Sequence, residues 1–167
     1  MSAIFNRVSV RKFKPEAVED DKVESLLRAG MQAPSAGNQQ PWQFIVVDDP
    51  AICEQLGATS KFSGPAKAAP LNIVPVICTE GARFPELAVL DLSACAENIL
   101  LRACELGLGA VWLCVYPEQD RISHVRSVLG IPEDLTPFAI LSVGYPESDP
   151  HPQQDRFDAQ RIHRNKW

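Results

Sequence analysis

The 167-residue sequence has no long hydrophobic run and no residue pattern typical of a metal site. No stretch of about 18 uncharged apolar residues occurs, which excludes a membrane-spanning helix. Residues 1–7 lack the apolar core of a secretory signal, so we expect a cytoplasmic protein. The five cysteines are scattered and odd in number, which favours buried reduced thiols over a disulfide framework. Neither a CxxC nor a His-x-x-x-His spacing is present, so we expect no structural metal site.

The common nucleotide-binding and hydrolase motifs are missing too. No GxGxxG opens a helix after a strand, and no Walker loop or GxSxG elbow occurs. The glycines of residues 107–109 lack a third glycine and a downstream acid, so we interpret them as a helix cap. These absences argue against a Rossmann domain, a P-loop nucleotidase and a serine hydrolase, and no catalytic triad is indicated.

Positive charge is scarce except at the two ends of the chain. The net charge is −5, which argues against a nucleic-acid partner. Residues 1–14 carry +4 and residues 151–167 carry +2, so residues 15–150 carry −11. Two basic ends on an acidic body suggest an anion site built from both termini. The alternative is two solvated basic tails.

The apolar fraction of 46% predicts one packed domain over residues 1–167. In the first half, we expect a helix over residues 21–32 with Asp20 or Asp21 as N-cap, a buried strand over 44–47 and a short helix from Pro50 to about Gly57. Residues 58–72 are expected to form a long loop, in which a helical turn is an alternative. A second strand over 73–78 contains Pro75, which predicts an edge strand or a bulge.

The second half is dominated by a helical pattern over residues 85–106. Its apolar residues cover nearly the whole circumference, so we expect a central helix and a second subunit to cover it. Strands are expected over 110–115 and 138–143, with a helix over 117–129 ended by Gly130. The tail, residues 147–167, ends in apolar residues and is expected to dock on the dimer. The fold class is α+β, with a central mixed sheet of about four or five strands flanked by helices.

Two segments have residues suited to ligand binding. Residues 7–13 read RVSVRKF, and an extended chain places Arg7, Ser9 and Arg11 on one face, as in a phosphate receptor. An ordinary exposed basic strand is the alternative. Residues 33–42 read APSAGNQQPW, a loop whose small residues and amides could approach a planar polar ligand. The alternative is a plain turn followed by a core tryptophan.

These two segments resemble the FMN-dependent nitroreductase family. The GLGAVWL of residues 107–113 after a long helix, the GYP of residues 144–146 after a strand, and the basic tail are similar to later parts of that family. The resemblance covers essentially the whole chain, with its motifs in the right order. It implies an intertwined homodimer with two FMN sites at the subunit interface, which agrees with the need to cover the 85–106 helix.

The resemblance also implies which residues bind FMN. Arg7 and Ser9 hold the phosphate and ribityl end, with Arg156 closing that site and Arg161 a weaker candidate, and Arg11 lies near N1 and O2 of the ring. Ring contacts are assigned to Pro34, Ser35, Ala36 and Asn38 of the other subunit, to the backbone of Leu113, Cys114 and Val115, and to Lys67 as a second cation. Val8 stands where many members have Arg or His, so one polar side-chain contact is absent. We interpret Cys114 as a core thiol, not a redox centre.

The implied activity is that of an NAD(P)H oxidoreductase acting on nitroaromatic, quinone-like or other small electron acceptors. FMN would carry the chemistry in a ping-pong cycle, so no catalytic side chain is expected. The chain is short for the family, which leaves little sequence for a specialised substrate pocket. Three alternatives remain: a flavin-binding or storage module without significant turnover, a member with specialised flavin chemistry, and a structural dimer without cofactor.

Overall fold

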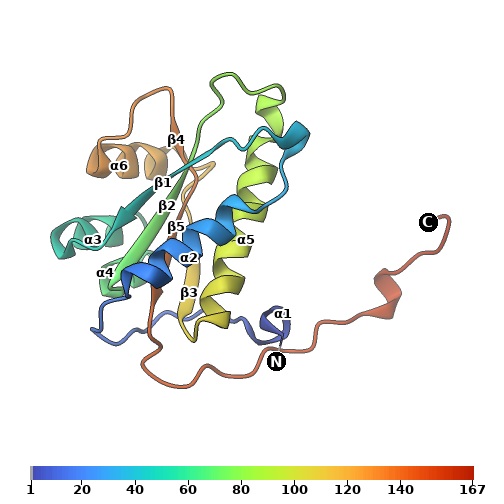
Figure 1. Cartoon of the computed structure of the whole chain (residues 1–167), viewed down its shortest axis with the longest axis horizontal. Coiled ribbons are helices and arrows are strands. Elements are labelled where there is room, and N and C mark those ends of the chain that lie inside the picture. The colour runs from blue at the N-terminus through green and yellow to red at the C-terminus, as the bar shows by residue number, and fades with distance from the viewer. Residues whose placement is uncertain (1) are drawn as a thin grey trace.

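The computed structural model describes residues 2–167 as a five-stranded sheet between two helical layers (Figure 1). The strands are β1 (Trp42–Val47), β2 (Leu71–Ile77), β3 (Gly109–Cys114), β4 (Thr136–Pro137) and β5 (Ala139–Gly144). The helices are α1 (Ala3–Asn6), α2 (Asp20–Met31), α3 (Pro50–Gly57), α4 (Gly64–Ala68), α5 (Ala88–Glu105) and α6 (Gln119–Leu129), with 3-10 turns η1 (Ala36–Asn38), η2 (Pro85–Leu87) and η3 (Ala159–Arg161). The predicted α+β class is confirmed.

The strand order is β1-β2-β5-β3, and β4 pairs with β2 off this path. Every pairing between these strands is antiparallel. The prediction of a mixed sheet is therefore wrong: the sheet is antiparallel, and one isolated parallel bridge joins Ser9 to Ala110 on the edge strand β3. The N-terminal segment therefore runs beside the sheet edge, which fixes the position of the basic residues that flank Ser9.

The strand that contains Pro75 is not at an edge, so that alternative of the prediction is wrong. β2 pairs with β1 on one side and with β5 and β4 on the other. On this second side the register shifts by one residue between the two partners, so residues 138–140 lie opposite residues 74 and 75. The bulge is therefore in the partner strand and not, as predicted, in the strand that contains Pro75. Phe138 N–H donates to the Pro75 carbonyl oxygen at 2.9 Å. The missing N–H of Pro75 thus falls where the hydrogen-bond ladder is already interrupted.

Each face of the sheet has its own hydrophobic core. α2 and α5 cover one face, and α3, α4 and α6 cover the other (Figure 1). On the first face Leu92 and Ile99 of α5 are fully buried, and each contributes about 1.5–3 kcal/mol through burial. A Cβ at Gly30 of α2 would lie 2.9 Å from Ile99 side-chain atoms, so glycine permits this close packing of the two helices.

The long helix is three residues shorter at its start than predicted. Residues 85–87 form the 3-10 turn η2, and α5 begins at Ala88. Its end is as expected: Gly107 has φ +75°, and Leu108 N–H donates to the Ala103 carbonyl at 2.8 Å. α5 is buried on most sides, yet Leu90 is 65% exposed. No helix within residues 2–167 is both long enough and apolar enough to cross a bilayer.

Three local predictions need correction. Glu19, not Asp20 or Asp21, is the N-cap of α2, and it makes no side-chain cap hydrogen bond; both aspartates lie in the first turn. Residues 58–72 are not one long loop, because they contain α4 and the start of β2. The alternative of a helical turn in this segment is confirmed by α4, which has Pro65 in its first turn, as helices tolerate.

The tail leaves the body of the molecule after β5 (Figure 1). It runs under the end of α5 and then away from it, with the C-terminus far from the sheet. Phe157 and Ile162 are exposed, and Trp167 is 100% exposed. Its docking on a partner subunit stays a prediction.

Candidate functional site

The two basic ends of the chain meet in one hollow of about 410 Å³. Arg7, Ser9 and Arg11 line it from the N-terminal segment, and Arg156 lines it from the tail. No acidic residue is among its lining residues within the described chain, residues 2–167. Three guanidinium groups and a hydroxyl around one hollow are the donor set that an anionic phosphate requires.

The sheet edge positions the N-terminal part of this cationic hollow. Val10 N–H donates to the Ala110 carbonyl at 3.0 Å, next to the Ser9–Ala110 bridge. This pairing demands close approach, since a Cβ at Gly109 would lie 2.6 Å from the Val10 Cβ. Gly109 therefore permits the segment to lie against β3. The alternation of an extended chain then brings Arg7, Ser9 and Arg11 to the same hollow.

Arg7 is the most enclosed of the three arginines. Its Nε lies 3.4 Å from Oε1 of Glu97 on α5, and its side chain is 18% exposed. Arg11 is exposed, and its Nη1 donates to the Ser9 carbonyl at 3.3 Å. Arg156 is also exposed. Because water screens exposed charges, Arg7 should interact most strongly with a bound anion.

The sequence prediction missed His151, which lines the cationic hollow beside Pro152. One of its ring nitrogens, Nδ1, lies 3.2 Å from the Pro152 carbonyl oxygen. The basic character of the tail was the only signal for such a residue, and a lone histidine in a proline-rich segment has no motif. The path of the tail brings it to the site.

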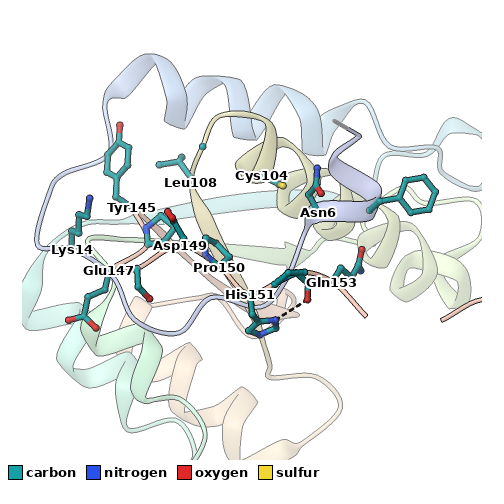
Figure 2. Close-up of a pocket in the computed structure, with 15 residues that line it drawn as sticks. Asn6, Lys14, Cys104, Leu108, Tyr145, Glu147, Asp149, Pro150, His151 and Gln153 are labelled. Carbon is teal, nitrogen blue, oxygen red and sulfur yellow. Dashed lines mark hydrogen bonds between the residues drawn. The ribbon is translucent and has the colours of Figure 1, made fainter. Parts of the chain in front are cut away.

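A larger hollow of about 730 Å³ lies between the tail and the end of α5 (Figure 2). Lys14, Glu147, Asp149 and His151 surround it with both signs of charge, so it lacks the uniform charge of the cationic hollow. Burial raises the pKa of the Cys104 thiol on its wall, against the lowering effect of Arg7. Cys104 therefore stays a neutral thiol at neutral pH.

Tyr145 fixes the point at which the tail leaves the sheet. Its hydroxyl donates to the carboxylate of Glu19 at 2.8 Å and contacts Lys22, which itself pairs with Glu19 at 3.0 Å. Hydrogen bonds from the backbone, from Tyr145 and from Lys22 lower the pKa of Glu19 to about 2. The same cluster raises the pKa of Lys22. It joins the start of α2 to the end of β5.

The second predicted segment, residues 33–42, is not part of the cationic hollow; residues 33–41 form the loop, and Trp42 begins β1. Pro34, Ser35, Ala36 and Asn38 lie beside the start of α5, where Ala36 N–H donates to Asp91 Oδ1 at 2.9 Å. The single chain does not bring these four residues to Arg7. Their contact with a flavin held by another subunit stays a prediction.

The backbone of β3 offers donors at an open edge. The Ala110 carbonyl faces the N-terminal segment. Backbone groups of a strand alternate in direction from residue to residue, so the N–H groups of Trp112 and Cys114 point toward the same edge as Ala110. Leu113 and Val115 are buried in the core, but Cys114 is exposed at the end of the edge strand β3. The interpretation of Cys114 as a core thiol is therefore wrong. The Cys114 carbonyl accepts a hydrogen bond from Arg121 at 3.0 Å.

Lys67 lies away from the other predicted site residues. It is on α4, in the helical layer opposite α5, and its Nζ is 2.7 Å from Oε1 of Glu54. Val8 is among the residues that line the cationic hollow, but its side chain has no polar group. The predicted role of Lys67 near a flavin ring stays a prediction.

The chain is thus an α+β protein with a cationic hollow at a sheet edge. The sequence model of the nitroreductase family matches residues 4–77 and 61–145. A protein from Archaeoglobus fulgidus, provisionally named NADH dehydrogenase/NAD(P)H nitroreductase, is 41% identical over all of this chain and 98% of its own length. The chain belongs to the nitroreductase family.

Solved structures agree with this assignment. The crystal structure of a provisionally named NADH oxidase from Clostridium acetobutylicum has a TM-score of 0.96 and 46% identity, with 99% of both chains covered. An FMN-dependent nitroreductase from Clostridium difficile has a TM-score of 0.92 and 30% identity, again over 99% of both chains. The family and these relatives support an oxidoreductase.

Proposed function

We propose that the protein is an FMN-dependent NAD(P)H oxidoreductase that reduces nitroaromatic, quinone-like or other small electron acceptors. The observation that carries this proposal is the cationic hollow, in which Arg7, Ser9, Arg11 and Arg156 converge from the two ends of the chain. These residues fit the phosphate end of FMN, because they offer several charged donors and no acidic residue lines the hollow. Arg7 also pairs with Glu97 on α5, at 3.4 Å, so a bound phosphate would share this guanidinium with that carboxylate. The FMN-dependent relative from Clostridium difficile supports the same cofactor.

The remaining predicted residues have roles that follow from their chemistry. FMN, when bound, would supply the hydride chemistry between the nicotinamide and the acceptor. Arg11, exposed at the rim of the hollow, would stabilise negative charge on the reduced ring. The N–H of Cys114 at the open edge of β3 would donate a hydrogen bond to the ring. No side chain needs to act as a general acid or base.

The site should be completed by a second copy of the chain. The loop over residues 33–41 lies apart from the cationic hollow of its own chain, so it would serve the flavin of the partner subunit. Exposed apolar residues on three elements support such a dimer, since each would be covered: Phe5 on α1, Leu90 on α5 and Phe157 in the tail.

An absorption spectrum of the purified protein, before and after addition of FMN, tests the proposal. Flavin bands that stay with the protein through desalting are expected, followed by bleaching under anaerobic NADH or NADPH. A flavin that neither nicotinamide reduces would favour a storage module instead. A colourless protein that cannot retain added FMN would overturn the assignment of the site.

A further inference from the structure

Asp91, in the first turn of α5, is a buried carboxylate held by neutral donors. It is 6% exposed, and within residues 2–167 it takes part in no ion pair. Its Oδ1 accepts from Ala36 N–H at 2.9 Å, and its Oδ2 accepts from Gln39 Nε2 at 2.7 Å. Burial of a charge without a counter-ion is costly. The two hydrogen bonds offset part of this cost, and both come from the same loop, which indicates that the carboxylate serves to hold that loop.

Gln39 completes the connection between the loop and the start of α5. Its Oε1 accepts from Phe84 N–H at 3.0 Å, and its Nε2 donates to the Phe84 carbonyl at 3.0 Å and to Asp91. The loop is therefore attached through one backbone N–H and both ends of one amide. We call these contacts of Asp91, Gln39 and Phe84 the loop clamp.

The clamped loop has a conformation that its sequence alone disfavours. Gly37 has φ +56°, and two residues with side chains also lie in the left-handed region, Asn38 at +55° and Gln40 at +49°. Such residues persist only where their surroundings hold them. Ser35 Oγ also accepts from Gln40 N–H at 3.0 Å, so hydrogen bonds restrain the loop on both sides of the strained residues.

We propose that Asp91 is a positioning residue that holds the loop of its own subunit against the flavin of the partner subunit. It contacts no ligand itself and acts through Ala36 and Gln39. This inference rests on the proposed function, because the loop must serve a flavin site. It adds that the carboxylate of one subunit controls the FMN affinity of the other.

The first test compares Asp91→Asn with Glu105→Gln. Asn has one acceptor oxygen in place of two, so one clamp hydrogen bond is lost while the shape is kept. The control removes a charge from the exposed end of the same helix. We expect Asp91→Asn to weaken FMN binding about ten- to hundredfold and the control to leave it unchanged. In the apoprotein, amide hydrogens of residues 35–40 should exchange faster only in Asp91→Asn. If Asp91→Asn changed neither the amide exchange of residues 35–40 nor the FMN affinity, the proposed role of Asp91 would be wrong.

Gln39→Met breaks the same clamp from the loop side and serves as a second variant if Asp91→Asn does not fold. It removes the hydrogen bonds to both Asp91 and Phe84 but leaves the carboxylate and α5 intact. We expect a loss of FMN affinity as large as that of Asp91→Asn. A folded Gln39→Met protein with the affinity of the wild type would contradict the proposal.

A hybrid dimer tests action across the interface. Two differently tagged chains, one with Arg7→Ala and one with Asp91→Asn, are co-expressed, and the hybrid is purified through both tags. If Asp91 acts on the partner's site, one site combines both defects and the other has neither. The hybrid should then retain one FMN per dimer with the affinity of the wild type.

The hybrid separates the two proposals. Two weakened sites and no site of wild-type affinity would mean that Asp91 acts within its own subunit, which overturns the inference and leaves the flavin site in place. A wild-type protein that binds no FMN would instead overturn the proposed function.

Discussion

The N-terminal segment and the loop over residues 33–41 have similar predicted roles but different positions in the fold. The first meets the tail of its own chain at the edge of β3, and together they form the cationic hollow. The second is attached to the start of α5 by the loop clamp and lines no part of that hollow. One half of the proposed flavin site is therefore assembled by the monomer, whereas in our proposal the other half comes from a second subunit.

The largest expected effect is that of a charge at the proposed interface. Leu90→Asp places a carboxylate on the exposed apolar face of α5, where a partner would bury it without a counter-ion at a cost of several kcal/mol. We expect monomers in light scattering and loss of bound FMN. Val46→Asp, at another exposed apolar residue on the edge strand β1, is the control and should stay dimeric. A Leu90→Asp protein that remains a dimer would place the interface elsewhere.

Removal of the enclosed cation tests the half of the site that the monomer assembles. Arg7→Ala should weaken FMN binding by about 1.5–3 kcal/mol, the range for a hydrogen bond to a charged group. Arg156→Ala should cost less, because Arg156 is exposed. Fluorescence titration measures both. Arg28→Ala, on the exposed surface of α2, should bind like the wild type. If Arg7→Ala, Arg156→Ala and Arg28→Ala all bound FMN equally well, the assignment of the cationic hollow to the FMN phosphate would be wrong.

A methyl group at Gly109 tests whether the sheet edge positions the basic segment. The new Cβ would lie 2.6 Å from the Val10 Cβ, so Gly109→Ala should lower the free energy of unfolding by about 1–3 kcal/mol and also weaken FMN binding. Chemical denaturation and FMN titration measure the two effects. Gly64→Ala, with open space around its Cβ, should change neither by much. Full stability in Gly109→Ala would show that the segment does not need this close approach.

The smallest effect concerns the cluster where the tail begins. The pKa of Glu19 is about 2 in the folded protein and 4.5 without its partners, so its contribution to stability is present above pH 4.5 and is lost as the pH falls toward 2. Glu19→Gln should therefore show a slightly flatter decline of the unfolding midpoint over this range. Glu24→Gln, an exposed acid on the same helix, is the control. If the unfolding midpoint of Glu19→Gln fell with pH as steeply as that of the wild type, Glu19 would not have the lowered pKa that the cluster predicts.

Local sequence patterns predicted most of the elements correctly. The helix from Pro50 to Gly57, the glycine ends of α5 and α6, and the α+β class with four or five strands are confirmed, because capping residues and apolar periodicity act over a few positions. Errors occurred where a distant partner decides the outcome. Pro75 lies inside the sheet because the register of its neighbours changes beside it, which the residues around Pro75 do not encode.

The candidate site divides in the same way. The RVSVRKF and APSAGNQQPW segments identified the family and the arginines, since both signals lie within a few consecutive residues. His151 escaped notice, because only the path of the tail brings it to the cationic hollow. Asp91 escaped notice too, because it is one of several charged residues spread along the helix, and only the packing of α5 against the loop shows that it is buried.

The sequence by itself determined the elements, the family and the cations at the two ends of the chain, because propensity, capping and short motifs depend on near neighbours. Tertiary structure alone decided which of these residues share a site. The Ser9–Ala110 bridge and the passage of the tail bring separated cations together, and the contact of Ala36 with Asp91 joins residues 55 positions apart. Such contacts depend on strand register and helix packing, which are set by the whole chain at once.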